Sequence, residues 1–402
     1  MDPRVCRIRL AALALHGSPL PTARLFEIFA SPEAVLSAAP ADVGHACGMT
    51  EAGIRALEAA RGAPVPQDQL DLLERLAIDI VSYEDPRYPE NLRHISDAPP
   101  VLFVKGTLHP EDRNAVAVIG SRKATPYGIS VCEAFSRALA AEGLCIVSGA
   151  ALGIDAIAHW TALEAGGRTL AVLGTGPESV YPKTNGALFK RIPAQGALLS
   201  EFPPGTPASP WNFPRRNRLI SGLALGVLVV EASERSGTAI TVRMALEQGR
   251  EVFAVPGDIR SRSSRGTHRL IKQGAKIAEC LADILEELPP AVSDSSGRAK
   301  GEGSGLCFRT EPASVERNPN RLSGNRNSRD ARADCPLSAP DLGHGSHAFR
   351  RLLRLIGDEG TSLETLVLRT GWPAPRIAGV LTELEVLGKV RRLPGNHFAR
   401  SD

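Results

Sequence analysis

The sequence of 402 residues lacks the features that mark a membrane or secreted protein. No stretch approaches the roughly 20 apolar residues that a membrane-spanning helix needs. The apolar segment near the N-terminus is short and is interrupted by Arg7 and Arg9, which is not typical of a signal peptide. These absences predict a cytosolic protein without a membrane partner.

Cysteine is present but is not arranged for metal or redox chemistry. The seven cysteines form no CxxC pair and no Cys/His cluster with the spacing of metal ligands. An odd, dispersed set of this kind is typical of reduced thiols in the core or on the surface. We therefore expect no metal site.

The usual sequence motifs for nucleotide cofactors are missing as well. The chain contains neither the dinucleotide motif GxGxxG nor the phosphate-binding motif GxxxxGK[ST]. We predict no cofactor, no catalytic residue and no enzymatic activity. The net charge is only +3, so binding to nucleic acid would require a local basic patch.

Short apolar runs are the main pattern that is present. Most of them end in glycine or an acidic residue, and helical segments separate them. Runs that are apolar at every position are typical of parallel strands buried on both faces. The sequence therefore predicts an α/β fold with a Rossmann-like, doubly wound, mostly parallel sheet. The expected strands are 102–106, 115–120, 144–149, 169–174, 197–201, 226–232 and 251–257.

Composition divides the chain into four regions. Residues 1–65 read as short helices, with Ser31 and Thr50 as N-caps. The α/β region spans 66–288, and residues 289–345, rich in Ser, Gly, Pro, Asn and Arg, predict a flexible linker. Residues 346–402 predict a winged-helix domain with its recognition-type helix at 375–387.

Two loops after predicted strands are suited to bind phosphate. In the first, Gly120 permits close approach of the backbone, Ser121 offers a hydroxyl and Arg122 a guanidinium. In the second, Ser148 and Gly149 precede a helix whose first turn exposes amide groups. Within that helix Asp155 and His159 stand four apart, a spacing compatible with acid/base chemistry but more typical of capping and internal hydrogen bonds.

Three further loops follow predicted strands and so lie at the same carboxyl edge of the predicted sheet. Two of them carry basic residues. One carries Lys183, and another opens a helix after Ser236 and Gly237. The densest cluster lies between them, where Phe213 precedes three arginines and could stack on a base: Arg215, Arg216 and Arg218. The segment 259–276 contains six basic residues and no acidic one. Several anion-binding turns in a row favour a ligand with many phosphates over a mononucleotide.

These motifs resemble the DNA-processing protein A family, DprA/Smf. The matching segments run in order through the α/β region: IGSR at 119–122, SGAALGIDAIAH at 148–159, VLGTGPESVYPKTN at 172–185, FPRRNRLISGL at 213–223 and GTHRLIKQGA at 266–275. A helical packet similar to a sterile-alpha-motif or helix-hairpin-helix domain precedes the core in many members, and a winged helix often follows. Two positions beside the expected groove, Trp160 and Glu178, depart from the family pattern.

The resemblance implies a protein that binds single-stranded DNA, dimerises, and loads RecA onto incoming strands in competition with single-strand binding protein. This activity belongs to natural transformation and DNA recombination. It would place Leu270 and Ile271 at the dimer or RecA contact. The strand would be held by Gly120, Ser121, Arg122, Ser148, Gly149, Lys183, Phe213, Arg215, Arg216, Arg218, Ser236 and Gly237.

Two other functions are weighed against this one. The alternative enzyme is a Rossmann-like nucleotide hydrolase of the lysine-decarboxylase-like group, which resembles a PGGxGTxxE pattern. This chain has SGTAITVRMALE instead, with Glu247 further along the helix. A transcriptional regulator acting through the winged helix is the third reading, and the basic content of that helix is only moderate.

Overall fold

The computed structural model describes most of the chain before the predicted linker and parts of the C-terminal region. The described residues are 2–16, 20–234, 236–289, 352–353, 355–357, 360–372, 374–386, 389–393 and 397–400. The predicted linker from residue 290 onward lies outside the described residues. Among them, no helix is both long enough and apolar enough to cross a membrane.

The N-terminal region is a packet of short helices, as expected. Ser31 and Thr50 cap their helices as predicted, since each side chain accepts a hydrogen bond from the amide three residues later. The packet comprises α1 (Pro3–His16), α2 (Thr22–Phe29), α3 (Pro32–Ser37), α4 (Pro40–Cys47), α5 (Glu51–Gly62) and α6 (Gln67–Arg75). Its apolar cluster extends past residue 65 to include Leu73, Ile80 and Phe103. The domain boundaries remain a proposal, and the hydrophobic core itself crosses the first of them.

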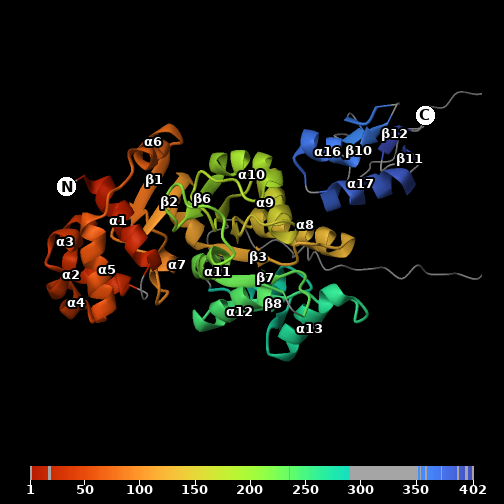
Figure 1. Cartoon of the computed structure of the whole chain (residues 1–402). Helices are drawn as coiled ribbons and strands as arrows, with labels where there is room; N and C mark the ends of the chain where they lie inside the picture. The colour runs from red at the N-terminus through yellow and green to blue at the C-terminus, as the bar shows by residue number, and fades with distance from the viewer. Residues whose placement is uncertain are drawn as a thin grey trace, which may run out of the picture.

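One nine-stranded sheet forms the centre of the molecule (Figure 1). Its strand order is β1-β2-β6-β5-β4-β3-β7-β8-β9. The strands from β6 to β9 pair in parallel, and β1 and β2 are antiparallel additions at one edge. The strands are β1 (Ile78–Ser82), β2 (Val101–Gly106), β3 (Ala115–Ile119), β4 (Cys145–Ser148), β5 (Thr169–Val172), β6 (Gly196–Ser200), β7 (Gly226–Val229), β8 (Glu251–Ala254) and β9 (Lys276–Ile277).

All seven predicted strands are present, so the predicted mostly parallel sheet is confirmed. The apolar-run pattern does not predict β1 and β9. In β1 an exposed aspartate, Asp79, interrupts the apolar residues, and β9 consists of two exposed residues at the sheet edge. Neither strand is therefore a continuous buried apolar run, which is the property that the pattern detects.

Helices cover both faces of the parallel part of the sheet. The apolar side chains of α8 (Pro126–Ala141) and α9 (Ile154–Glu164) pack on one face, with α14 (Ala282–Leu285). Residues of α11 (Asn212–Leu223) and α12 (Thr238–Glu247) pack on the other, with α7 (Glu90–Arg93). Figure 1 shows these two helical layers above and below the strands, together with α10 (Gly186–Arg191) and α13 (Arg265–Lys272).

The order of the strands reverses beside β3. The chain proceeds from β3 through β4 and β5 to β6 on one side, and then returns to place β7 on the other side of β3. Doubly wound sheets bind ligands beyond the carboxyl ends of the strands at such a reversal. The loops after β3 and β7 meet at this point.

The C-terminal region contains the helices and strands of a winged helix. It contains β10 (Thr361–Ser362), α16 (Leu363–Thr370), α17 (Ala374–Val386), β11 (Val390–Leu393) and β12 (His397–Arg400), and the strands form a separate sheet. The predicted recognition-type helix, 375–387, coincides with α17 within one residue at each end. This unit lies beside α8 of the core (Figure 1).

Candidate functional site

The loop after β3 is held in place by the loop after β4, which leads into α9. The amide of Ile154 donates to the carbonyl of Ser121 at 3.1 Å. Gly153 has a φ of +76°, and a Cβ atom there would lie 2.2 Å from the carbonyl oxygen of Ser121. Position 153 therefore needs glycine both for its backbone conformation and for its contact with this loop.

A buried carboxylate holds the other end of the same loop. Glu231 follows β7 and is almost fully buried. It accepts hydrogen bonds from the amide of Thr125, at 2.9 Å, and from the Thr125 hydroxyl. That hydroxyl caps α8 through the amide of Gly128 at 3.2 Å. The loop carrying Ser121 and Arg122 is thus fixed between α8, α9 and the end of β7.

Basic side chains on these braced loops point to solvent. Arg122, Lys123 and Lys183 are exposed, and none of them forms a salt bridge with another of the described residues. Asn185 anchors the Lys183 loop to the second loop, because its Nδ2 donates to the carbonyl of Ala150 at 3.0 Å. The structure therefore brings the first three predicted loops together at one edge of the sheet.

The second loop is closed and internally bonded. The Ser148 hydroxyl donates to the carbonyl of Val118 at 2.7 Å, and the Gly149 amide donates to Asp155 at 3.2 Å. Burial raises the pKa of the Asp155 carboxyl, against the opposing effect of Arg216. His159 is fully buried with its Nδ1 2.6 Å from the Thr169 hydroxyl, and burial lowers its pKa to about 3. The pair serves internal hydrogen bonding, the interpretation favoured from sequence over acid/base chemistry.

Arg216 lies beneath the loops and is only 4% exposed. Its Nη1 donates to the carbonyl of Gly149 at 2.8 Å and to that of Val172. A Cβ atom at Gly149 would approach Nη2 to 2.7 Å. Burial lowers the pKa of this guanidinium to about 10, which leaves it charged at neutral pH. Arg216 is thus a fixed positive charge that ties the ends of β4 and β5 to α11.

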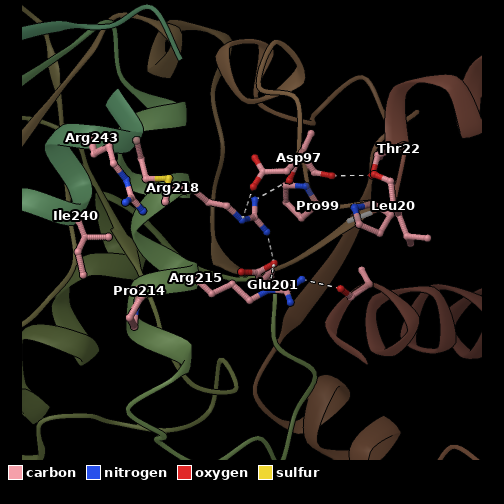
Figure 2. A pocket seen from close by; sticks show the side chains of 14 residues that line it. Leu20, Thr22, Asp97, Pro99, Glu201, Pro214, Arg215, Arg218, Ile240 and Arg243 are labelled. Carbon is pink, nitrogen blue, oxygen red and sulfur yellow. Dashed lines mark hydrogen bonds and ion pairs between the residues drawn. The ribbon is translucent and has the colours of Figure 1, made fainter. Parts of the chain in front are cut away.

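The other two arginines of the cluster face the N-terminal packet. Arg218 is 6% exposed, and it donates to Glu201 and, at 2.7 Å, to the carbonyl of Asp97. Nε of Arg215 lies 3.3 Å from Oε2 of Glu201, and its Nη2 donates to the carbonyl of Ala14 at 2.6 Å. Figure 2 shows Arg215 and Arg218 converging on Glu201. The three residues line a cleft of about 550 Å³ between the helical packet and α11–α12.

The three arginines therefore do not form the open phosphate clamp that their spacing suggested. All three lie on α11 as predicted, but their guanidinium groups are engaged by protein carbonyl groups and by Glu201. Direct contact of these residues with DNA stays a prediction. Sequence spacing could not detect this arrangement, because the acceptors come from five separate segments of the chain.

The remaining predicted residues lie at the same edge. Phe213 packs against Gly174, and its ring centroid is 5.4 Å from that of Tyr181. Ser236 and Gly237 immediately precede α12, where Gly237 is exposed. Leu270 and Ile271 lie apart from this site on α13, each partly exposed. The basic residues predicted on that segment, among them Arg265 and Arg269, are exposed as well.

The residues that support the first loop were missed from sequence. Glu231, Thr125 and Asn185 bear no positive charge, and although Asn185 ends the matching segment VLGTGPESVYPKTN, nothing in that segment singles it out as a support. One available signal was the acidic residue at the end of an apolar strand, in VVEA at 229–232. A carboxylate there lies where the strand order reverses. Trp160 and Glu178, which depart from the family pattern, are a buried ring and a carboxylate that accepts from the Gly205 amide at 2.9 Å.

Comparison with known proteins gives consistent matches over the whole described core. Residues 79–289 match the family model for DNA recombination-mediator protein A, and residues 336–396 match the DprA winged helix domain. The chain is 36% identical to Protein Smf of Escherichia coli over 87% of this chain and 86% of that protein. It is 46% identical to the DNA processing protein DprA of Streptococcus pneumoniae over 50% of this chain and 72% of that one.

A solved structure supports the same fold. The X-ray structure of DprA from Streptococcus pneumoniae superposes with a TM-score of 0.61 and 34% sequence identity. The superposition covers 72% of this chain and 98% of the solved one.

Proposed function

The chain belongs to the DNA recombination-mediator protein A (DprA/Smf) family, and from this premise we propose that it binds single-stranded DNA across the carboxyl edge of its sheet. The strand is protected there and delivered to RecA during natural transformation and recombination. Related proteins carry the name DNA processing protein, which supports a role on DNA.

The observation that carries the proposal is the row of braced loops with exposed basic side chains. Arg122 and Lys183 project from loops that follow β3 and β5, and neither is engaged in a salt bridge with the described residues. Neighbouring strands lie about 4.8 Å apart, so two strand spacings separate these loops by about 10 Å. That span suits a polymer of phosphates better than one phosphate group.

The predicted contacts divide into two roles in this proposal. Exposed and partly exposed residues touch the strand: Ser121, Arg122, Lys183, Phe213 and the Ser236–Gly237 turn. Buried and partly buried residues position them: Gly120, Ser148, Gly149, Arg215, Arg216 and Arg218. Arg216 adds a fixed positive charge under the loops, since its guanidinium is held close to Gly149.

The test is salt-dependent binding to an unstructured oligonucleotide. We expect the Arg122→Ala, Lys183→Ala double variant to weaken binding at least tenfold, because each charge-assisted hydrogen bond contributes about 1.5 to 3 kcal/mol. Each phosphate contact on a single strand contributes about 0.7 to the slope of log K against log salt. Loss of two contacts should therefore reduce that slope by about 1.4.

A charge-matched control is available away from the edge. Arg75→Ala with Arg137→Ala removes the same two charges from exposed positions on α6 and α8. This control should bind as the unmodified protein does. Equal losses in both double variants, or tighter binding to blunt duplex than to single strands, would contradict the proposal.

Delivery to RecA and displacement of single-strand binding protein extend the proposal. We place self-association and the RecA contact on α13, because Leu270 and Ile271 are partly exposed there next to the edge strand β9. Ile271→Glu should lower the sedimentation mass to that of a monomer. RecA filament assembly on strands coated with single-strand binding protein should slow with the same variant.

The hydrolase alternative gains no support from the geometry. Glu247, the acidic residue nearest to its pattern, is exposed at the C-terminal end of α12 and lies 3.6 Å from Arg243. The carboxyl edge of the sheet faces the other end of that helix.

A further inference from the structure

Trp211 is the most exposed large apolar residue that the structure describes. It is 86% exposed at the N-cap position of α11. The other two tryptophans, Trp160 and Trp372, are 3% and 1% exposed. An indole ring is among the largest apolar surfaces a residue offers, and proteins bury most of that surface unless a ligand or partner uses it.

The position of Trp211 is fixed relative to the loops of the proposed strand site. The next residue, Asn212, donates from Nδ2 to the carbonyl of Gly174 at 3.0 Å and to that of Pro207 at 3.3 Å. Gly174 lies just beyond the carboxyl end of β5, in the connection that continues to Lys183. The indole is therefore carried by a helix end that is anchored to the same edge of the sheet.

Two more aromatic rings lie beside this anchor. Phe213 packs on Gly174, and the ring of Tyr181 lies against it with the planes inclined at 33°. Tyr181 is 49% exposed, so this pair also presents an aromatic surface. We call Tyr181, Trp211 and Phe213 the aromatic ledge. Exposed Lys183 follows Tyr181 by two residues on the same connection.

We propose that the aromatic ledge is a base-stacking subsite, in which Trp211 binds the face of an unpaired nucleobase. The inference rests on the proposed function, and it adds Trp211 and Tyr181 to the residues that contact the strand. A stacked ring requires no particular hydrogen-bond pattern, so the subsite accepts any base of a single strand. Bases paired in a duplex are stacked on each other and do not present a free face, so the ledge favours single strands.

The charge around the ledge favours a nucleic acid over a protein as its occupant. Lys183 and Arg122 are cationic and unpaired among the described residues, and Tyr181 and Trp211 are apolar. An unpaired strand offers phosphates and ring faces in alternation, which matches both kinds of group. A second copy of this chain would bring further positive charge to the same edge.

The experiment compares an oligothymidine with an abasic oligomer of equal length, which keeps the phosphates and lacks the bases. Trp211→Ala should weaken oligothymidine binding roughly 5- to 150-fold, the range for loss of one base–aromatic stack. Its affinity for the abasic oligomer should equal that of the unmodified protein. Trp211→Phe should retain most of the affinity, because a phenyl ring also stacks. Ile28→Ala, an exposed apolar residue on α2, is the matched control and should have no effect.

Intrinsic fluorescence supplies a second readout. Because Trp211 is the exposed one of the three tryptophans, oligothymidine should quench its emission and shield it from iodide. Trp211→Phe should abolish the quenching while binding persists.

The outcomes separate this inference from the function on which it rests. Failure of the unmodified protein to bind oligothymidine would overturn both. Normal binding by Trp211→Ala, or equal losses on the two oligomers, would overturn the stacking subsite alone. A variant that loses self-association but keeps its affinity per protomer would identify the ledge as a protein interface and also overturn it.

Discussion

Because the imidazole of His159 is buried, the stability of the core beneath the site depends on pH. Its Nδ1 lies 2.6 Å from the Thr169 hydroxyl, and burial lowers its pKa from 6.5 to about 3. Below pH 6.5 the unfolded chain binds a proton at this residue and the folded chain does not. Stability is therefore intact above pH 6.5 and is lost as the pH falls from 6.5 toward 3.

We expect this one histidine to remove about 2 kcal/mol of stability between pH 7 and pH 5. His159→Asn should show a smaller drop over that interval, measured by urea unfolding at both pH values. The raised pKa of Asp155 acts in the opposite direction, because its carboxyl binds a proton more readily in the folded chain. It is common to both proteins, so the comparison isolates the imidazole. Equal drops would show that His159 titrates in the folded state.

The arginine cluster shows where inference from residues fails. Sequence reasoning located Arg215, Arg216 and Arg218 on one helix beside the loops, and the structure agrees. It could not find their acceptors, because Ala14, Asp97, Gly149, Val172 and Glu201 lie 14 to 201 positions from the arginines that they engage. A guanidinium buried among carbonyl groups and one open to phosphate look the same in a sequence.

At the scale of elements, the contact between the start of α9 and the loop after β3 holds the loop that carries Arg122 in place. Gly153→Ala should place a methyl group against the Ser121 carbonyl, where the available distance is 2.2 Å. We expect a loss of about 2 to 4 kcal/mol in the free energy of unfolding, from the left-handed backbone and the overpacking together. Binding of single strands should fall roughly tenfold, as Arg122 is displaced.

Gly143 provides the matched control for that change. It has a φ of +78°, and a Cβ atom there would meet nothing within 4 Å. Gly143→Ala should cost about 1 to 2 kcal/mol in stability and leave binding unchanged. If the two variants lose stability and affinity equally, the loop contact has no effect of its own.

Secondary structure was predictable wherever burial leaves a pattern in the sequence. The runs that became β3 and β7 are apolar at every position because helices cover both faces of these strands. β1 escaped detection because the sheet edge leaves Asp79 exposed. The hydrogen bond from Thr125 to Glu231 depends on the register in which β3 pairs with β7, and no local sequence pattern specifies that register.

At the scale of the whole molecule, one acidic residue joins the helical packet to the sheet. Glu201 is buried and faces Arg218 and Arg215, and Arg215 reaches the C-terminal end of α1. Arg218→Ala should lower the free energy of unfolding by about 3 kcal/mol, because it leaves a buried carboxylate with only partial compensation.

Two variants check that value by urea unfolding. Arg55→Ala breaks an exposed ion pair with Glu51 within α5 and should cost less than about 0.5 kcal/mol. The Arg218→Met, Glu201→Leu double variant should recover much of the loss, since neither charge then remains buried without the other. A loss from Arg218→Ala no larger than that from Arg55→Ala would mean that the buried ion pair with Glu201 does not stabilise the fold.

The pairing of β3 with β7 also matters while the chain is being made. Val116 pairs with Gly226, so the central strand gains its second neighbour only after about 110 further residues have been added. At about 5 to 20 residues per second, translation leaves that edge of β3 open for roughly 5 to 20 seconds. The apolar face that later lies under α11 and α12 is uncovered during the same interval, and exposed apolar surface beside an unpaired strand edge favours aggregation of the nascent chain.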